Sequence, residues 1–384
     1  MFDASEIGRS SFAAVSDETR LALLNEQLAH AAARSPYYAK VLAGRFPLQG
    51  LSGLADLTFT DETVLRREGR RLVCAAGSEI TRIVSLSTSG SAGDAKRLYF
   101  TENDLRRTAA FFSSGMAWMC APGDVCAVLM PCEAPDGVGD LLCRGLKAIG
   151  IRPLRIGIPA DPAAAEEALR AAAPQVLVGF PWHIRLLALR CPSLRPRAVL
   201  LSGDYVPAGL RALIAERWHT AVLSHYGLTE TGYGCAVQHP SGETLYLRRD
   251  ELIAEVVSPE TGSPLPPGCP GELVLTTLRR EAMPLLRYRT GDRAVLTPDG
   301  NLKSVSGRLA APQEFYRLQD ALAPLPWLWD FRAAAGVLTA DLAPDAPPDA
   351  AELLSAVTGL RTDLRTVPPA LAACFDRGKR QITE

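Results

Sequence analysis

The sequence has no apolar run of the ~18 residues that a membrane-spanning helix needs, so we expect no membrane span. It also has no excess of charge of one sign. Its 41 Lys and Arg residues oppose 42 Asp and Glu residues, for a formal net charge of −1. This balance argues against a nucleic-acid-binding surface and against a polybasic membrane patch. We therefore expect neither nucleic acid nor membrane among the partners.

Signals of secretion are missing as well. The start of the chain, MFDASEIGRSSFAAVSDE, has no basic n-region and no apolar core, which argues against a signal peptide. The nine cysteines are odd in number and show no framework spacing. We expect reduced thiols and a cytoplasmic location.

The middle of the chain alternates between strand-like and helix-like segments. Short β-rich apolar runs, each ending in Gly, Pro or Asp, occupy residues 125–131, 175–181, 197–204 and 220–227. Segments rich in Ala, Leu and Arg, typical of helices, occupy residues 140–149, 161–173, 182–191 and 207–217. This alternation predicts an α/β structure with a largely parallel sheet, in which ligands bind beyond the carboxyl ends of the strands.

The two ends of the chain differ from this middle part. Residues 11–34 have apolar positions at helical spacing and predict an N-terminal helix. From about residue 245 the sequence becomes β-rich, and residues 307–384 can form a small α/β unit. We predict an α/β fold with a large multi-layer N-terminal domain, residues 1–306, whose mixed sheets are flanked by helices. A small C-terminal α/β cap domain would occupy residues 307–384.

A polar loop between two of the predicted strands is the first candidate site. The stretch SLSTSGSAGDAKRLYFT, residues 85–101, is rich in Gly, Ser and Thr and contains Lys96. Such a loop presents backbone amides and hydroxyls to a polyphosphate, and a lysine neutralises its charge. It does not fit the common phosphate loop, because Ala95 stands at its second Gly position and Arg97 follows the lysine. Taken alone, the stretch could equally be a mobile surface turn.

Two further motifs follow the loop in order, SHYGLTETG at 224–232 and RYRTGD at 287–292. With these three motifs the sequence resembles the adenylate-forming ligases, the acyl- and aryl-CoA synthetase superfamily, and within it the phenylacetate–CoA ligase-like branch. The resemblance covers about residues 30–310. It is supported by SPYYAKVL (35–42), LADLTFT (54–60), LSGDYVP (201–207) and GELVLTTL (271–278).

The resemblance implies an ATP-dependent ligase that activates a carboxylic acid in two steps. The carboxylate attacks the α-phosphate of ATP to give acyl-AMP and pyrophosphate, and the thiol of coenzyme A then displaces AMP. ATP, Mg²⁺ and coenzyme A are the implied cofactors, and a small carboxylic acid is the implied partner. The alternatives are transfer to a carrier-protein thiol or to an amine, and a degenerate homologue that binds nucleotide without turnover. The oligomeric state stays open, a homodimer included.

The resemblance also assigns the phosphate-binding residues. The β- and γ-phosphates would contact the loop residues Ser87, Thr88, Ser89, Gly90, Ser91, Ala92, Gly93 and Lys96. Thr229 would donate to the α-phosphate, and Glu230 would hold Mg²⁺, a hard cation suited to carboxylate oxygens. Lys379, in the tail CFDRGKRQITE, matches the family lysine that bridges the α-phosphate and the attacking carboxylate. The other reading of this tail is a solvated basic C-terminus.

Nucleoside recognition is assigned in the same way. The adenine would contact Gly203, Asp204, Tyr205, Tyr226 and Gly227. Asp292 would accept the ribose hydroxyls, and Arg308 matches the family arginine near ribose and phosphates. The family continues this arginine with a hinge carboxylate, whereas Leu309 is followed here by two alanines. This difference puts a large rotation of the small domain in doubt.

The acid pocket and a possible zinc site rest on weaker signals. Aromatic residues near the predicted strand ends could line a pocket for an aromatic or other bulky apolar acid, or could be core residues: Trp118, Phe180, Trp182 and Tyr233. Cys235, His239 and Cys269 raise the question of zinc, because some relatives have a zinc cluster here. A structural zinc site needs a fourth ligand, which we do not find, so we expect no zinc.

Overall fold

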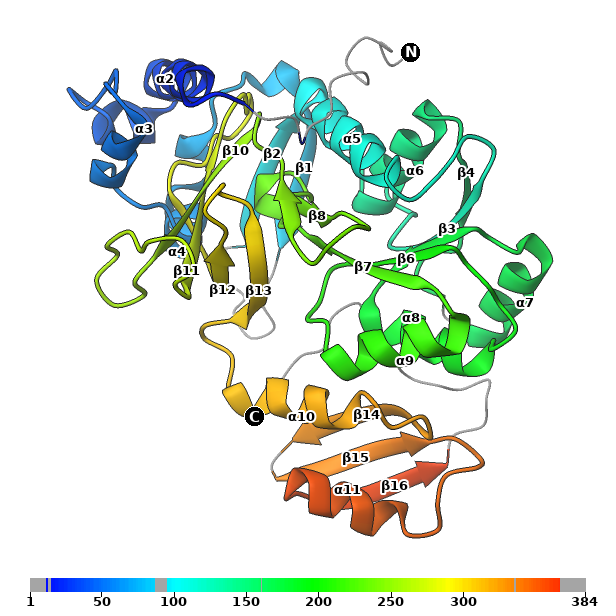
Figure 1. The fold of residues 1–384 in the computed structure, drawn as a ribbon. Helices are drawn as coiled ribbons and strands as arrows, with labels where there is room; N and C mark the ends of the chain where they lie inside the picture. Colours follow the sequence, from blue (N-terminus) through cyan, green and yellow to red (C-terminus); the bar gives the residue numbers. More distant parts are fainter. Residues whose placement is uncertain (1–11, 13–14, 87–94, 160, 335, 367–384) are drawn as a thin grey trace. The chain divides into compact units, whose positions relative to one another are not determined.

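The computed structural model describes residues 12, 15–86, 95–159, 161–334 and 336–366 (Figure 1). It divides into two compact units, and each unit is built from two separate stretches of the chain. Unit 1 comprises Met1–Gly115 and Tyr226–Ala310, and unit 2 comprises Met116–His225 and Ala311–Glu384. The boundary predicted between residues 306 and 307 stays a prediction.

Unit 1 begins with helices and continues with antiparallel strands. Its described helices are α2 (Asp17–Arg34), α3 (Pro36–Val41), η1 (Leu51–Asp56), α4 (Glu62–Glu68), η2 (Gly69–Leu72), η3 (Gly77–Glu79), α5 (Glu102–Met116) and η4 (Thr229–Thr231). Helix α2 begins at Asp17 because the Ser16 side chain accepts a hydrogen bond from the Thr19 amide, and two acidic residues fill its first turn. The predicted N-terminal helix is therefore confirmed from residue 17 onward.

The strands of unit 1 form a hairpin and an antiparallel ladder. Strands β1 (Ile80–Leu86) and β2 (Lys96–Thr101) pair antiparallel, which confirms that the polar loop joins two strands. The ladder runs in the order β10-β11-β12-β13-β9-β8. Its members are β8 (Ala236–Gln238), β9 (Leu245–Leu247), β10 (Leu252–Val257), β11 (Gly271–Thr277), β12 (Tyr288–Leu296) and β13 (Leu302–Arg308). The β-rich texture predicted from about residue 245 is thus confirmed.

Unit 2 contains the predicted parallel sheet, in the order β7-β6-β5-β3-β4. Its strands are β3 (Val125–Leu129), β4 (Arg152–Arg155), β5 (Val176–Gly179), β6 (Ala198–Leu201) and β7 (Ala221–Tyr226). The helices between them are α6 (Val138–Ala148), α7 (Pro162–Ala172), α8 (Pro181–Arg190) and α9 (Ala208–Trp218). Every residue of β3, β5 and β6 is buried, as expected for parallel strands covered on both faces.

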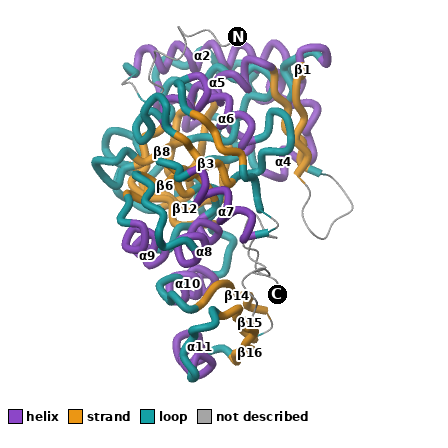
Figure 2. Tube along the Cα trace, turned by 90° about the vertical axis from the view of Figure 1, so that its right-hand side faces the viewer, coloured by secondary structure: helices purple, strands orange, loops and turns teal. Residues whose placement is uncertain are grey.

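The C-terminal stretch of unit 2 forms a second, smaller sheet. Strands β14 (Leu328–Ala334), β15 (Val337–Leu342) and β16 (Arg361–Thr366) lie beside helices α10 (Gln313–Leu322) and α11 (Ala350–Thr358), as Figure 2 shows. The small α/β structure predicted for this stretch is confirmed, and so is the α/β fold class. Among the described residues, no helix has the length and apolar character that a membrane crossing requires.

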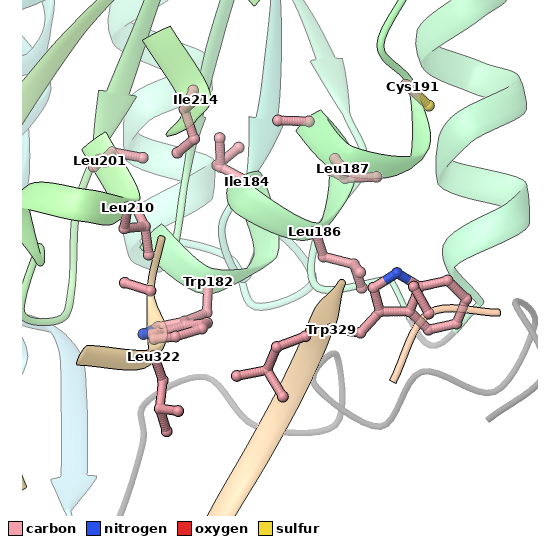
Figure 3. Close-up of a cluster of buried hydrophobic side chains, with 14 of the residues drawn as sticks. Trp182, Ile184, Leu186, Leu187, Cys191, Leu201, Leu210, Ile214, Leu322 and Trp329 are labelled. Atoms are coloured by element: carbon pink, nitrogen blue, oxygen red, sulfur yellow. The ribbon is translucent and has the colours of Figure 1, made fainter. Parts of the chain in front are cut away.

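The C-terminal stretch shares one hydrophobic core with helices α8 and α9 (Figure 3). Trp182 of α8 packs edge-on against Phe331 of β14, with ring centroids 5.3 Å apart. The guanidinium of Arg185, fully buried, donates to the carbonyls of Ala323, Leu325 and Leu328 at 2.5 to 2.8 Å. Residues 311–366 are therefore an integral part of unit 2.

Candidate active site

A buried ion pair lies at the start of strand β2. The ammonium Nζ of Lys96 is 2.6 Å from the carboxylate Oε1 of Glu230, and both side chains are more than 90% buried. The Oε2 atom of Glu62, at the start of α4, lies 3.8 Å from the same ammonium. Lys96 therefore has two carboxylate neighbours from two different segments of unit 1.

The loop that carries Glu230 follows strand β7 and includes η4. Gly232 ends η4 with a φ of +88°, and a Cβ there would lie 2.8 Å from Nη1 of Arg280. The Tyr233 amide donates to the Leu228 carbonyl at 2.7 Å and closes the turn. This turn holds the Glu230 side chain inside unit 1, where it is 7% exposed.

Tyr288, the first residue of β12, completes the surroundings of Glu230. Its hydroxyl donates to the Glu230 Oε1 atom at 3.2 Å, and the Tyr288 side chain is buried. Burial alone would raise the pKa of Glu230. The charge of Lys96 and the hydrogen bonds from Lys96, from the Glu230 amide and from Tyr288 outweigh burial, so the pKa lies below its ordinary value. Glu230 is therefore held as a carboxylate.

A second polar cluster in unit 1 surrounds Asp292. Its Oδ2 atom accepts the Tyr226 hydroxyl at 2.7 Å, and its Oδ1 atom lies 3.0 Å from Nε of Arg308. Strands β12 and β13 place Asp292 opposite Arg308 in the ladder. Burial and the negative charge of Asp292 raise the pKa of Tyr226, so the phenol keeps its proton and donates. The structure thus brings three sequence-predicted residues into direct contact.

Unit 2 holds a third group of predicted residues at the carboxyl ends of β5 and β6. Gly203 has a φ of +88°, and a Cβ on it would lie 2.6 Å from Cε1 of Phe180. Only glycine allows the Phe180 ring this close. The Asp204 side chain accepts from the Tyr205 amide at 2.8 Å, which shapes the loop after β6. Ser202 and His225 are joined by a 2.8 Å hydrogen bond between Oγ and Nδ1.

The model of the family described as AMP-binding enzyme matches residues 83–278, just over half of the chain. The chain belongs to the AMP-binding enzyme family. The matched region includes Lys96 and Glu230, so the buried ion pair lies inside the part of the chain that defines the family.

Curated relatives and solved structures agree with this membership. The chain is 31% identical over 303 residues to a phenylacetate–coenzyme A ligase of Thermus thermophilus, covering 71% of this chain and 64% of that relative. A phenylacetate–coenzyme A ligase of Aromatoleum evansii is 40% identical over 93 residues, which cover 23% of this chain and 21% of that enzyme. The chain thus spans less than two thirds of the length of these curated relatives.

Solved structures match almost the whole chain. A 2-hydroxyisobutyryl-CoA ligase, in its postadenylation state and in complex with R3-HIB-AMP, has a TM-score of 0.74 at 20% identity. The match covers 92% of this chain and 86% of that ligase, and it shows a shared fold. The resemblance to the adenylate-forming, phenylacetate–CoA ligase-like enzymes is confirmed by these comparisons.

In this AMP-binding enzyme, two residues predicted at the nucleotide or acid have partners that the sequence did not indicate. The Tyr205 hydroxyl donates to Asp320 of α10 at 3.0 Å, and its ring packs edge-on against Tyr316. The indole Nε1 of Trp182 donates to Gln319 at 2.9 Å. Trp182 lies in the core of unit 2, and its role at the acid stays a prediction.

The other predicted residues are placed as follows. The Tyr233 ring stacks on Phe100, with centroids 5.8 Å apart, and Trp118 is half-buried in the turn after α5. Thr229 and Gly227 are half-buried in the loop that carries Glu230. The roles of these residues stay predictions. The loop residues 87–93 and Lys379 lie outside the described residues.

The Glu230 carboxylate suits Mg²⁺ only as one ligand of a metal that is bound together with a nucleotide. Mg²⁺ in phosphoryl-transfer sites is held by one or two carboxylates together with substrate phosphates and waters. Glu230 supplies such a hard oxygen ligand. Among the described residues, no three His, Cys, Asp or Glu side chains gather into a set that could hold a metal. One carboxylate and the phosphates of ATP therefore fit the chemistry.

Two of the residues considered as zinc ligands, Cys235 and His239, have hydrogen-bond partners within the protein. Cys235 is buried, its Sγ lies 2.9 Å from Thr231 Oγ1, and burial raises the pKa of its thiol to about 11. The His239 ring is hydrogen-bonded to Ser241 at 2.7 Å. The absence of zinc stays a prediction.

Several residues of the site were missed by sequence reasoning. Tyr288 lies inside the RYRTGD motif, and its position four residues before Asp292 could have marked it as a candidate. Glu62 and Asp320 come from helices without any motif. No sequence signal connects them to Lys96 or Tyr205.

Proposed function

We propose that the protein is an AMP-forming carboxylate–CoA ligase. It would convert a carboxylic acid and ATP into acyl-AMP and pyrophosphate, and then acyl-AMP and coenzyme A into an acyl-CoA thioester and AMP. The observation that carries this proposal is the buried Lys96–Glu230 pair in the family-matched region, with Glu230 in the loop that directly follows Tyr226 of β7. The names of the curated relatives, phenylacetate–coenzyme A ligases, support an aromatic acid as the substrate.

The first half-reaction brings two anions together, so its catalysis consists mainly of charge neutralisation and alignment. Lys96 would neutralise the β- and γ-phosphates together with the loop residues 87–93, and Thr229 would donate to the α-phosphate. Glu230 would hold Mg²⁺, which supplies positive charge to the phosphate oxygens when bound. Lys379 would place its ammonium between the α-phosphate and the attacking carboxylate.

Nucleoside recognition would use the second polar cluster. Asp292 has two carboxylate oxygens, and both ribose hydroxyls can donate to them. Tyr226 and Arg308 contact these same oxygens in the structure, so they would orient the carboxylate for the ribose. Gly203, Asp204 and Tyr205 of unit 2 would contact the adenine, and Phe180 and Tyr233 would contact the acid.

The second half-reaction is an acyl transfer from the mixed anhydride acyl-AMP to a thiol. The coenzyme A thiol loses its proton, its sulfur attacks the acyl carbonyl, and the C–O bond to AMP breaks. Because AMP leaves as a phosphate anion, it needs no protonation by the protein.

A pyrophosphate-release assay over a panel of aromatic and aliphatic acids, with and without coenzyme A, tests the proposal. We expect acid-dependent pyrophosphate release, and acyl-CoA formation only when coenzyme A is present. Release that never yields acyl-CoA would indicate a carrier-protein thiol or an amine as acceptor. ATP binding without release, over the whole panel, would indicate a homologue without turnover.

Lys379 gives a sharper test of the first half-reaction. Lys379→Ala should slow the formation of acyl-AMP from acid and ATP, while the conversion of supplied acyl-AMP to thioester stays nearly unchanged. Equal loss in both half-reactions, or no loss in either, would reject its role.

A further inference from the structure

The two oxygens of the Glu230 carboxylate have different surroundings. Oε1 receives two donors, the Lys96 ammonium at 2.6 Å and the Tyr288 hydroxyl at 3.2 Å. Oε2 receives no side-chain hydrogen bond from any residue that the structure describes. The side-chain donors of the described residues thus gather on one oxygen of the carboxylate, in addition to the hydrogen bond that the carboxylate receives from its own amide.

The strand pairing and the burial of Tyr288 fix the position from which its hydroxyl reaches Oε1 of Glu230. It lies in β12, where it pairs with Leu275 of β11 on one side and forms a bridge to Thr60 on the other. Its side chain is 3% exposed, so the ring has little room to move. In this contact the phenol hydroxyl is the donor and the carboxylate oxygen is the acceptor.

We infer that Tyr288 is a positioning residue of the proposed ligase: with Lys96 it occupies Oε1 of Glu230 and so presents Oε2 to the metal of the metal–nucleotide complex. The inference rests on the proposed function, since it assigns the metal to Glu230. It adds a residue to the site and specifies which oxygen binds.

Metal binding at Oε2 would preserve the Lys96–Glu230 ion pair. A metal at Oε1 would have to displace a buried ammonium, whose remaining carboxylate neighbour among the described residues is Glu62 at 3.8 Å. A metal at Oε2 leaves the ion pair intact. Groups that orient a metal ligand commonly change metal affinity 10- to 100-fold when they are removed.

Tyr288→Phe removes the hydroxyl and keeps the ring that fills the site. Tyr38→Phe is the matched control, because Tyr38 is also buried in unit 1 and its hydroxyl donates to the Pro284 carbonyl at 2.9 Å. Mn²⁺ replaces Mg²⁺ as the probe, and electron paramagnetic resonance measures free Mn²⁺ in the presence of a non-hydrolysable ATP analogue. The affinity of each protein for the analogue without metal is measured by calorimetry.

We expect Tyr288→Phe to weaken Mn²⁺ binding about tenfold, at the lower end of the range for such partners. Tyr38→Phe should bind Mn²⁺ like the unmodified protein. Both variants should bind the metal-free analogue unchanged, which separates a metal effect from a general loss of structure.

Three outcomes would overturn the inference. Unchanged Mn²⁺ affinity in Tyr288→Phe would show that the hydroxyl does not orient Glu230. A lost thermal transition in Tyr288→Phe, with a normal one in Tyr38→Phe, would show that Tyr288 supports the fold. The third outcome is that the unmodified protein binds the analogue but binds no Mn²⁺ with it, which would refute the metal role of Glu230 and the inference with it. The proposed ligase activity is tested independently, by acid-dependent pyrophosphate release.

Discussion

The Lys96–Glu230 ion pair should contribute both to stability and to function, and variants of the two residues can separate these contributions. Lys96→Met leaves a carboxylate that is more than 90% buried without its counter-charge. Removing one partner of a buried ion pair typically costs about 3–5 kcal/mol of the free energy of unfolding. Glu230→Gln should cost less, because Lys96 keeps Glu62 at 3.8 Å as a second, half-exposed partner. The double variant replaces both charges and should recover most of the loss.

Urea unfolding of the four proteins at pH 7 gives these free energies. We expect a coupling free energy of at least about 2 kcal/mol, so that the double variant is more stable than Lys96→Met. If the two single losses are each below about 1 kcal/mol and simply add, the buried ion pair does not exist as described.

The pH dependence gives the pair a second signature. In the unmodified protein the folded-state pKa of Glu230 lies below its ordinary value. Its stabilising contribution is therefore present above the unfolded-state pKa of about 4.3 and is lost as the pH falls through the folded value. In Lys96→Met the charge of the lysine no longer opposes burial, so the pKa of Glu230 rises and the deficit of this variant should shrink on acidification. The double variant should nevertheless stay inactive, by roughly 10²-fold or more, because both charges of the proposed phosphate site are gone.

Three further predictions concern other parts of the chain. Asp292→Asn should weaken ATP binding in calorimetry about tenfold or more, because the charged hydrogen bonds to the ribose are worth about 1.5–3 kcal/mol; unchanged affinity would reject the ribose role. Arg185→Met should lower the free energy of unfolding by at least about 3 kcal/mol, since three buried carbonyls lose their donor, whereas exposed Arg217→Met should change it by less than about 0.5 kcal/mol; a loss below about 1 kcal/mol in Arg185→Met would contradict the buried contacts. Burial lowers the pKa of His225 to about 4, so the unfolded chain binds its proton first and stability should fall as the pH drops from about 6.5 to about 4, by up to about 3 kcal/mol; an equally steep fall in His225→Gln would refute this origin.

The sequence predicts those elements whose residues are buried in an unbroken run. Strands β3, β5 and β6 are fully buried, and their apolar runs stand out between helical segments. Strand β4 was missed because it reads Arg-Pro-Leu-Arg, and it lies at the end of the strand order, where a proline is tolerated. Strand β16, RTDLRT, was missed for a similar reason, because it ends the order of the small sheet and is mostly polar.

In the candidate site, too, residues in local motifs can be predicted from the sequence, whereas contacts between residues far apart in the chain cannot. Lys96, Glu230 and Asp292 come from local motifs, and the structure gives each a direct polar partner among the motif residues. The hydrogen bond between Tyr205 and Asp320 joins residues 115 positions apart, and no periodicity reports such a contact. Trp182 follows a strand end, as pocket residues do, but a helix that comes 137 residues later covers it.

The division of the chain into two units, each built from two stretches, constrains the order in which the protein can fold during its synthesis. Each unit needs two stretches, and the stretch that completes unit 1 ends at Ala310. Domains usually fold one after another as they leave the ribosome. Here the first 115 residues must wait for residues 226–310, and the parallel sheet must wait for the helix that carries Gln319 to cover Trp182. The apolar surface around Trp182 is therefore covered only late in translation, when the helix that carries Gln319 has left the ribosome.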